Sequence, residues 1–282
     1  MAHETDASDL IRLDLYPLDK PGDPRLEAVI AKARADIDRD QVCVLENFIT
    51  EEARQAMVDQ AMATLPLAHT NRSHRTCFLN QKPNPEKPAD HPMNMFFDAR
   101  YRMMAYDLFD PDGPLPRFYG WKPVREMIAA ILGLPVLYMN DDPYQPANII
   151  CYGDGDRSTW HFDRGNEFTT TLMLQEPMGG GVFEIAPEIW PDDEHDPTDL
   201  RKVLLEEGDD LVRRVDRVPA SLVIFRGNRS VHRVTEVEGD RLRLMAVMVY
   251  EEKPGVIGRP EVNATVYGPR VAAAQAAAAA AQ

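Results

Sequence analysis

The chain has 282 residues, of which 44% are hydrophobic and 27% charged, values that are ordinary for a globular protein. Its formal net charge of −15 and its pI of about 4.9 make phosphate backbones and anionic membrane surfaces poor partners. Basic residues occur only in short pairs such as Arg213-Arg214, which argues against an enzyme that repairs nucleic acids. We therefore expect a small-molecule partner, with no nucleic acid and no membrane, and the sequence is compatible with a homodimer.

Cysteine usage and the start of the chain bear on the compartment. Cys43, Cys77 and Cys151 are odd in number and widely spaced, so they predict neither a disulfide scaffold nor a zinc signature. The first residues are acidic and lack an apolar signal region, and no run reaches the roughly 18 apolar residues of a membrane span. These features predict a cytoplasmic protein.

The first predicted elements are a helix, a strand and a second helix. Asp23-Pro24 is typical of an N-cap followed by a first-turn proline, and apolar residues then recur at helical spacing. We expect a strand over 41–49, followed by a helix that Thr50 caps and that ends near Pro66.

The next segment, 67–97, is polar and rich in proline, and we expect it to be irregular. Such a long loop favours a lid or a wall of a substrate pocket over a plain surface excursion. Arg72 and Arg75 are candidates for binding a substrate carboxylate, and the alternative is that they are surface arginines that offset acidic neighbours. Three histidines of this region have no partner spacing and are expected at the surface or in loops: His69, His74 and His91.

Two helices are expected before the composition changes. Residues 98–110 look helical although they lack caps, and Trp121 to Leu132 is a better helix that Gly133 closes as a left-handed C-cap. Its apolar side chains are expected in the core.

From about Leu137 onward, short strands separated by glycine and proline turns are typical of an antiparallel sandwich or barrel. Gly179 to Gly181 lacks a following helix and a basic residue, so it indicates a turn and not a phosphate loop. The acidic stretch 190–199 is expected to be a loop with His195 exposed, and 199–218 to hold a short helix and a strand. Expected strands lie at 146–152, 168–175, 182–185, 220–225, 230–234 and 241–250.

His161-Phe162-Asp163 lies in a further stretch, 157–164, that we expect to be extended. Successive side chains of a strand point to opposite faces, so the imidazole and the carboxylate would share a face, with Phe162 turned away. His232, in another predicted strand, adds a second imidazole. Two histidines and one carboxylate form the facial triad that leaves positions open on ferrous iron. The alternative is a half-buried strand in which His161 and Asp163 only hydrogen-bond each other.

Arg243 follows the second histidine by eleven positions, where a guanidinium can hold the far end of a dicarboxylate. His161, Asp163, His232 and Arg243, in this order, resemble the Fe(II)/2-oxoglutarate-dependent oxygenases. The resemblance implies a mainly-β (α+β) fold with a double-stranded β-helix core, a cupin-like jelly roll, on which N-terminal helices pack. It also implies an enzyme that uses Fe(II), 2-oxoglutarate and O2, with the first three residues as metal ligands and Arg243 on the 2-oxoglutarate carboxylate.

The resemblance also implies a division of the chain into domains. We expect a single catalytic domain over 1–270, with N-terminal helical support over 23–135 and the jelly-roll core over 136–255. Residues 271–282 are almost all Ala and Gln and are expected to be a frayed helix or a disordered tail without a catalytic role.

Two more residues compete for or assist the cosubstrate site. Arg241 would share a strand face with Arg243, and the spacing favours Arg243 as the cosubstrate ligand. A hydroxyl often assists this arginine in the family, and Thr171 is the candidate, although threonines are also common in strands for packing reasons.

A finer resemblance covers roughly residues 140–255. Trp160-His-Phe-Asp163, the threonine-rich run 168–175 and Val231-His-Arg-Val234 resemble the subgroup of hydroxylases and radical halogenases that act on free amino acids. In its halogenases a small residue replaces the carboxylate and frees a position for chloride, whereas Asp163 is retained here. The resemblance therefore implies hydroxylation, or desaturation or ring closure by the same chemistry, rather than halogenation.

Two positions depart from a lysine-binding member of this subgroup, which would offer imidazole and acidic groups where this chain has Ser158 and Arg164. Arg164 would repel an ammonium and suits an anionic group; the alternative is a salt bridge to Asp154 or Asp156. We therefore predict a small carboxylate-bearing substrate, an amino acid or close derivative other than lysine.

Two other functions stay open at this level. A metal cupin that needs no cosubstrate would turn over no 2-oxoglutarate. A non-enzymatic jelly-roll binding protein, in which His161 and Asp163 are structural, would retain no stoichiometric iron.

Overall fold

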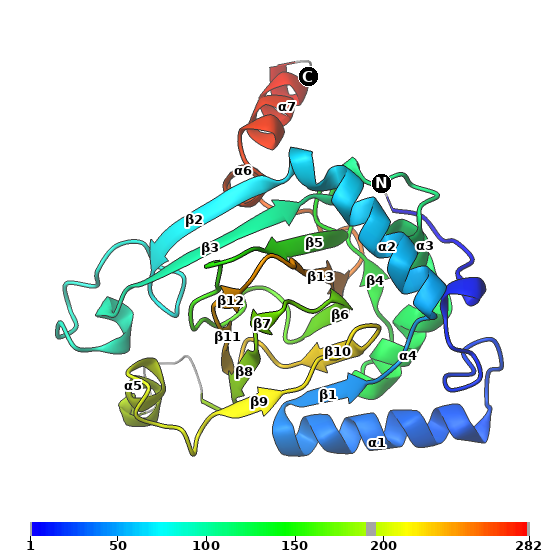
Figure 1. The fold of residues 1–282 in the computed structure, drawn as a ribbon, viewed down its shortest axis with the longest axis horizontal. Helices are drawn as coiled ribbons and strands as arrows, with labels where there is room; N and C mark the ends of the chain where they lie inside the picture. The colour runs from blue at the N-terminus through cyan, green and yellow to red at the C-terminus, as the bar shows by residue number, and fades with distance from the viewer. Residues whose placement is uncertain (1, 190–195, 281–282) are drawn as a thin grey trace.

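A computed structural model describes residues 2–189 and 196–280 of the chain (Figure 1). Its largest element is a seven-stranded sheet in which every neighbouring pair is antiparallel. Its strands, in spatial order, are β1 (Val42–Leu45), β10 (Leu222–Phe225), β6 (Thr169–Gln175), β13 (Arg243–Met248), β5 (Ala147–Tyr152), β3 (Phe97–Met104) and β2 (His69–Arg75).

A smaller sheet faces the inner side of the large one. Apolar side chains of both sheets, such as Phe183 and Val223, form one cluster between them. The predicted double-stranded β-helix is therefore confirmed, and the α+β class with it. The small sheet is β11 (Val231–Val234), β8 (Phe183–Ala186) and β9 (Arg213–Val215); two short pairs are β12 (Val237–Glu238) with β7 (Gly179–Gly180) and β14 (Tyr250–Glu251) with β4 (Tyr138–Met139).

The helices of the N-terminal half cover the outer face of the large sheet (Figure 1). Asp23 and Thr50 cap α1 and α2 as expected, since Asp23 Oδ1 accepts from Arg25 N at 2.9 Å and Thr50 Oγ1 from Ala53 N at 3.1 Å. Gly133 ends α4 at φ +71°. The helices are α1 (Pro24–Asp40), α2 (Glu51–Thr64), α3 (Pro114–Gly120), α4 (Lys122–Leu132), α5 (Thr198–Leu204), α6 (Pro260–Tyr267) and α7 (Pro269–Ala280), with short 3-10 helices η1 (Ser8–Leu10), η2 (Leu65–Leu67), η3 (Pro92–Asn94) and η4 (Tyr106–Leu108).

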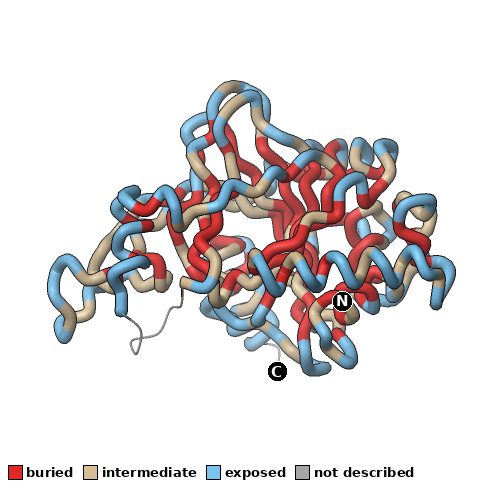
Figure 2. Tube along the Cα trace, turned by 90° about the horizontal axis from the view of Figure 1, so that it is seen from below, coloured by how far each residue is buried: buried red, intermediate tan, exposed pale blue. Residues whose placement is uncertain are grey.

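The core has two layers, one on each face of the large sheet. Burial is concentrated along the central strands and on the inward sides of the helices (Figure 2). On the outer face, Leu172 and Leu244 pack with helical residues such as Met57 and Ile128. The inner face carries polar groups among aromatic rings. Because buried polar groups are costly unless they are paired, this face is the expected position of a functional site.

Two predictions for residues 67–110 are wrong. His69–Arg75, expected to be irregular, forms strand β2, and most of the segment expected to be helical, 98–110, belongs to strand β3. Phe97, Ala99 and Tyr101 alternate with charged residues along β3, a period-two pattern that belongs to a strand. β2 is polar on both faces and therefore carries no apolar alternation.

The hairpin of β2 and β3, together with β1, draws three strands of the large sheet from the region expected to give helical support. The division into one domain over 1–270 stays a prediction.

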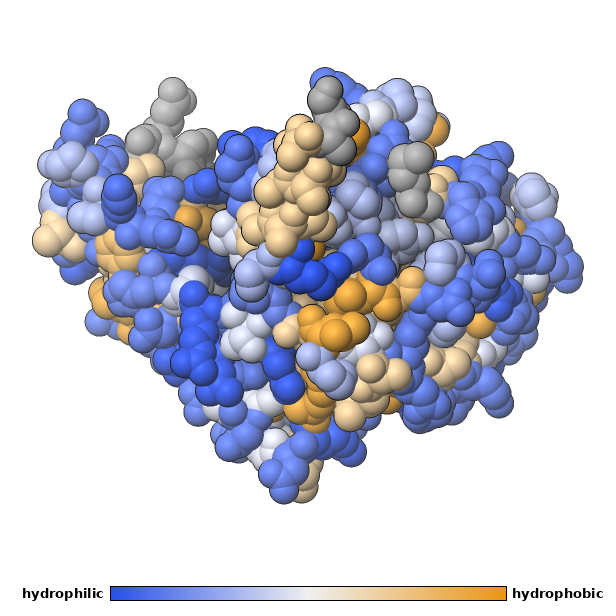
Figure 3. Space-filling model, turned by 90° about the horizontal axis from the view of Figure 1, so that it is seen from above, coloured by the Kyte–Doolittle hydropathy of each residue, from blue (hydrophilic) through white to orange (hydrophobic). Residues whose placement is uncertain are grey.

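The C-terminal run of alanines is helical in α7, which projects from the body of the molecule (Figure 1). Seen from above, most of the surface is hydrophilic, and apolar colour gathers mainly beside this helix (Figure 3). Among the residues that the structure describes, no helix combines the length and the apolar character needed to cross a bilayer. His195, expected to be exposed, lies outside the described residues.

Candidate iron and 2-oxoglutarate site

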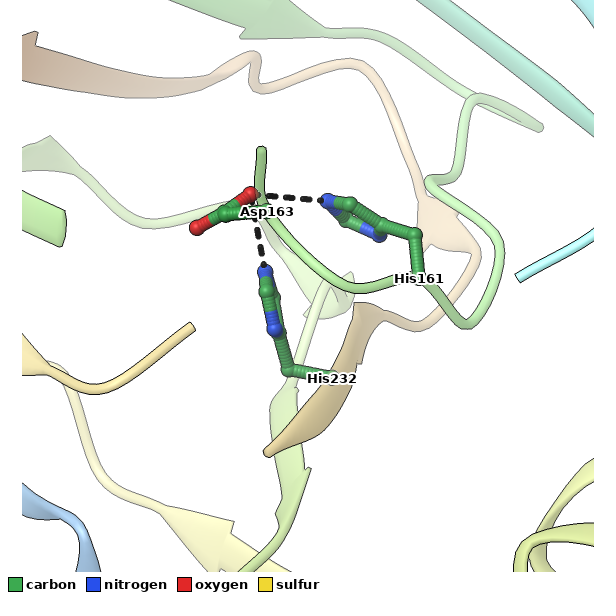
Figure 4. A group of neighbouring side chains, drawn as sticks. All are labelled: His161, Asp163 and His232. Carbon is green, nitrogen blue, oxygen red and sulfur yellow. Dashed lines mark ion pairs between the residues drawn. The ribbon is translucent and has the colours of Figure 1, made fainter. Parts of the chain in front are cut away.

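His161, Asp163 and His232 meet at one point between the two sheets (Figure 4). Asp163 Oδ1 lies 3.6 Å from His161 Nε2 and 3.5 Å from His232 Nε2. One ligand atom from each residue lies within 4.8 Å of the others, a separation that a single metal ion can span. The expected convergence of residues about seventy positions apart in the chain is therefore present.

The backbone joins the two histidines directly. His161 N donates to His232 O at 2.9 Å, and His232 N donates to His161 O at 3.0 Å. This isolated antiparallel bridge places both imidazoles on one side, with ring centroids 4.3 Å apart. Asp163 N donates to Gly227 O at 3.0 Å, so the third residue is tied to the turn that precedes β11.

Each imidazole presents the correct nitrogen for a metal. His161 Nδ1 lies 2.7 Å from Thr159 O and His232 Nδ1 lies 2.9 Å from Ser230 O. Because a carbonyl oxygen only accepts, each Nδ1 carries the proton and each Nε2 keeps its lone pair for a metal. Burial, and then the nearby His232, lower the pKa of His161 to about 3, which keeps it neutral at ordinary pH.

The Asp163 carboxylate is held from two sides. Burial opposes its ionisation, but His232 and His161 and a hydrogen bond from Thr169 Oγ1 to Oδ2 lower its pKa well below the ordinary value. A methyl group placed on Gly227 would overlap this carboxylate, with its carbon 2.9 Å from Asp163 Cγ. Position 227 therefore leaves the room that a carboxylate at position 163 needs.

Arg243 is 1% exposed and begins β13 on the inner face. Its Nε donates to Gly181 O at 3.0 Å, and its two terminal nitrogens lie 3.8 Å from Met245 Sδ. Burial lowers the pKa of this guanidinium, and no ion pair with a carboxylate is found for it within 2–189 and 196–280. A buried cation whose outer nitrogens meet only a weak thioether acceptor suits an anionic ligand.

Gly179 and Gly180, expected in a turn, form the short strand β7, and Gly181 follows it. Gly181 has φ +62°, and a Cβ there would approach Arg243 Cδ and Val237 Cγ2 to 3.0 Å. Only glycine therefore lets this backbone lie against the arginine stem and accept its Nε–H.

The choice between the two arginines of this segment agrees with their burial. Arg241 is exposed and donates to Pro177 O at 2.8 Å, whereas Arg243 points into the barrel. Thr171 also faces inward, and its hydroxyl is buried without a hydrogen-bond partner among the residues described. It is thus free to meet a ligand.

The three predicted substrate arginines separate in space. Arg75 is half-buried near the triad, where its charge lowers the pKa of His161, and its Nε is buried without a partner in the described chain. Arg72 is exposed, on the opposite face of β2 from Arg75. Arg164 is exposed and donates to Phe78 O and, at 3.0 Å, to Asn80 Oδ1, so neither Asp154 nor Asp156 is its partner. It ties the metal-ligand segment to the chain that follows β2.

Sequence reasoning did not find Arg217, Thr169, Gly181 or Gly227. Arg217 is 8% exposed, and its Cζ lies 3.3 Å from the centre of the Phe183 ring. Burial, and then the charge of Arg243, lower its pKa well below the ordinary value. Two of these carried a local signal: Thr169 is a strand hydroxyl six residues after Asp163, and Gly181 ends a run of three glycines.

Comparison with known proteins agrees with this geometry. The family model described as Halogenase D matches residues 26–257, which is most of the chain. This chain belongs to the halogenase D family. Its fold and its triad place it in the Fe(II)/2-oxoglutarate oxygenase superfamily, whose cofactors are ferrous iron and 2-oxoglutarate. The predicted resemblance is confirmed at this level.

Solved structures show the same fold at low identity. The halogenase D chain is similar to a 2OG-Fe(II) oxygenase family oxidoreductase from Burkholderia pseudomallei, at 12% identity and a TM-score of 0.51, over 80% of this chain and 92% of the other. The epimerase SnoN of nogalamycin biosynthesis has 14% identity and a TM-score of 0.56, over 81% and 82%. AviO1 from Streptomyces viridochromogenes has 14% and 0.54, over 82% and 97%. No curated protein matches the chain in sequence.

Proposed function

We propose that this halogenase D family member is a hydroxylase that oxidises an unactivated C–H bond of a small carboxylate-bearing metabolite, an amino acid or a close derivative, while 2-oxoglutarate is converted to succinate and CO2. The observation that carries the proposal is the convergence of His161, Asp163 and His232, together with a buried Arg243 whose outer nitrogens have no acidic partner in the described chain.

Each residue of the site has a separate binding role in this proposal. His161, Asp163 and His232 would hold iron through two Nε2 atoms and one carboxylate oxygen, and Arg243 with Thr171 would hold the far carboxylate of 2-oxoglutarate. When bound, iron and 2-oxoglutarate would together reduce O2, so that one oxygen atom enters succinate and the other oxidises the C–H bond of the substrate. The rings of Phe183 and Phe225, with centroids 5.7 and 4.9 Å from that of His232, exclude water from this space.

Asp163 supports oxidation of the hydroxylase type within a family whose model is named for halogenation. Thr169 donates to this carboxylate, and Gly227 leaves room for it. Both residues therefore support Asp163 as a third protein ligand of the iron, beside the two histidines. A ligand retained in this way occupies the position that chloride would need. Desaturation and ring closure use the same residues and stay within the proposal.

The substrate class rests on Arg75. This guanidinium is half-buried near the triad with an unpaired Nε, which suits a carboxylate on the substrate. Arg164 supports the pocket by holding the segment at Phe78 and Asn80, rather than by facing the substrate itself. Arg72 faces away and has no part in the proposal.

The test is succinate release from 2-oxoglutarate by the iron-loaded protein in air, screened across amino acids and their derivatives. One compound class bearing a carboxylate is expected to stimulate release and to gain a hydroxyl group, detected by mass. Asp163→Ala is the control and should release none. A chlorinated product in chloride buffer, or release that no carboxylate-bearing compound stimulates, would contradict the proposal.

A further inference from the structure

Arg217 and Arg243 come from different segments, yet both line one cavity of about 320 Å³. Arg243 begins β13, and Arg217 lies in the link between β9 and β10. Arg217 Nη1 is 3.1 Å from Met245 Sδ, the sulfur that both terminal nitrogens of Arg243 approach to 3.8 Å. A single thioether therefore lies between two buried guanidinium groups.

Within the described residues no carboxylate forms an ion pair with either arginine, and Asp163 acts on Arg217 only through the electrostatic attraction of its charge. Glu176 and Asp216 line the mouth of the cavity, but both are exposed, and neither forms an ion pair with Arg217 or Arg243 in the described chain. Arg217 Nε and Nη2 are buried without a hydrogen-bond partner there. Two like charges in a poorly solvated space repel each other, and a thioether is only a weak acceptor. An anion in the cavity would satisfy both.

We propose that Arg217 is a second guanidinium for the far carboxylate of 2-oxoglutarate, so that Arg217 and Arg243 hold that group together. The inference rests on the proposed function and deepens it. A carboxylate has two oxygens with about four acceptor positions, enough for two guanidinium groups. Sharing one cavity and one sulfur with Arg243 favours the cosubstrate over the substrate as the partner of Arg217.

The stacking of Arg217 fixes where its charge lies. Its Cζ is 3.3 Å from the centre of the Phe183 ring and 5.2 Å from that of Phe225, and both rings contact His232. The rings of Phe183 and Phe225 thus separate the Arg217 guanidinium from the candidate metal ligand His232. A pocket with two cations in this place should select a 2-oxo acid that ends in a carboxylate over one that ends in a methyl group.

The experiment compares two 2-oxo acids, 2-oxoglutarate and 2-oxovalerate, which have the same chain length but differ in the second carboxylate. Their affinities are measured by calorimetry with the anaerobic iron-loaded protein. The rise in the thermal unfolding midpoint on adding 2-oxoglutarate is measured on metal-free protein as a second readout. Arg217→Met keeps the unbranched stem over Phe183, Arg217→Lys restores a charge, and Arg243→Met is the reference. Arg214→Met removes an exposed arginine that pairs with Glu184 at 3.2 Å and is the control.

Arg217→Met is expected to weaken 2-oxoglutarate binding roughly tenfold to a hundredfold, the range for a hydrogen bond to a charged group, and to leave 2-oxovalerate binding unchanged. It should also reduce the rise in the unfolding midpoint, Arg217→Lys should recover part of both effects, and Arg214→Met should change neither.

Equal weakening of both oxo acids would overturn the inference, because it would indicate a general structural role. Unchanged 2-oxoglutarate binding with a higher KM for the oxidised substrate would overturn it too, and would assign Arg217 to the substrate. If Arg243→Met alone abolishes selectivity for the dicarboxylate, only the role of Arg217 fails. If the unmodified protein binds no 2-oxoglutarate, the proposed function itself fails.

Discussion

The iron side of the barrel and the β2–β3 hairpin differ in how completely the fold engages their polar groups. On the iron side, the ligand residues and Arg243 are fixed by hydrogen bonds: both Nδ1 atoms to carbonyls, Asp163 Oδ2 to Thr169, and Arg243 Nε to Gly181. The hairpin is at the sheet edge, and Arg75 on its inner face has a buried Nε without a partner in the described chain. The fold thus sets the geometry of the three candidate ligands, whereas under the proposed function a substrate carboxylate would supply the contact that Arg75 lacks.

The largest effect is expected when the Asp163 carboxylate is removed from the iron side. Asp163→Gly should lower succinate formation to background and reduce the iron content, because one of three ligands is lost. Asp163→Asn, of nearly equal volume, separates loss of the charge from loss of packing against Gly227. Wild-type hydroxylation by Asp163→Gly would show that iron does not use this carboxylate.

A smaller effect on iron binding is expected when the space between Gly227 and the Asp163 carboxylate is filled. Gly227→Ala would force its methyl group against Asp163, and we expect iron affinity to fall roughly tenfold to a hundredfold, as is usual when a supporting contact of a metal ligand is lost. Gly153→Ala is the matched control, since a Cβ there comes no closer than 3.3 Å to any neighbour, the nearest being the end of Arg102. Competitive chelation measures both affinities. Equal affinities in the two variants would contradict the prediction.

On the hairpin, the expected effect is confined to the substrate. Arg75→Met should raise the substrate KM roughly tenfold to a hundredfold, the range of a lost hydrogen bond to a charged group, and leave iron content unchanged. Arg72→Met, on the other face of β2, is expected to change neither quantity. Steady-state kinetics with the compound found in the succinate screen gives the comparison. If Arg72→Met had the larger effect, the assignment of the two faces would be wrong.

The smallest effect belongs to a position outside both regions. Thr50→Ala removes the side chain that accepts from Ala53 N at the start of α2, and should cost about 1 kcal/mol of unfolding free energy. Because α2 packs on the outer face of the large sheet, iron and 2-oxoglutarate affinities should stay as they are. Denaturant unfolding gives the first quantity, and calorimetry the others. A change in iron affinity would show that the outer face influences the site.

The sequence predicted the iron side better than the hairpin for a physical reason. Strand β10 is a continuous apolar run, β13 is apolar after Arg243, and β6 joins three threonines to Leu172, Met173 and Leu174. His161, Asp163 and His232 lie on or beside predicted strands, so pattern and spacing carried the information. β3 has a period-two pattern that could have been recognised, but β2 is polar on both faces because its inner face borders the site. No apolar periodicity exists for such a strand.

The residues that support the ligands could not be predicted from the neighbouring sequence alone. Arg217 lies beside Arg243 only because β9, β10 and β13 come together, and its contacts with Phe183 and Met245 cross more than twenty residues of chain. Gly227 gained its meaning from a carboxylate sixty-four positions earlier. Long-range contacts of this kind depend on the register of strands, which the order of residue types alone does not give.

The paired backbone hydrogen bonds between His161 and His232 have a bearing on metal exchange. They join main-chain atoms only and leave the metal-binding Nε2 atoms unused, so we expect the two segments to stay paired when iron is removed. Structural zinc modules, by contrast, unfold on demetallation. Chelation followed by reloading should therefore restore the iron content of the protein without a cycle of unfolding and refolding.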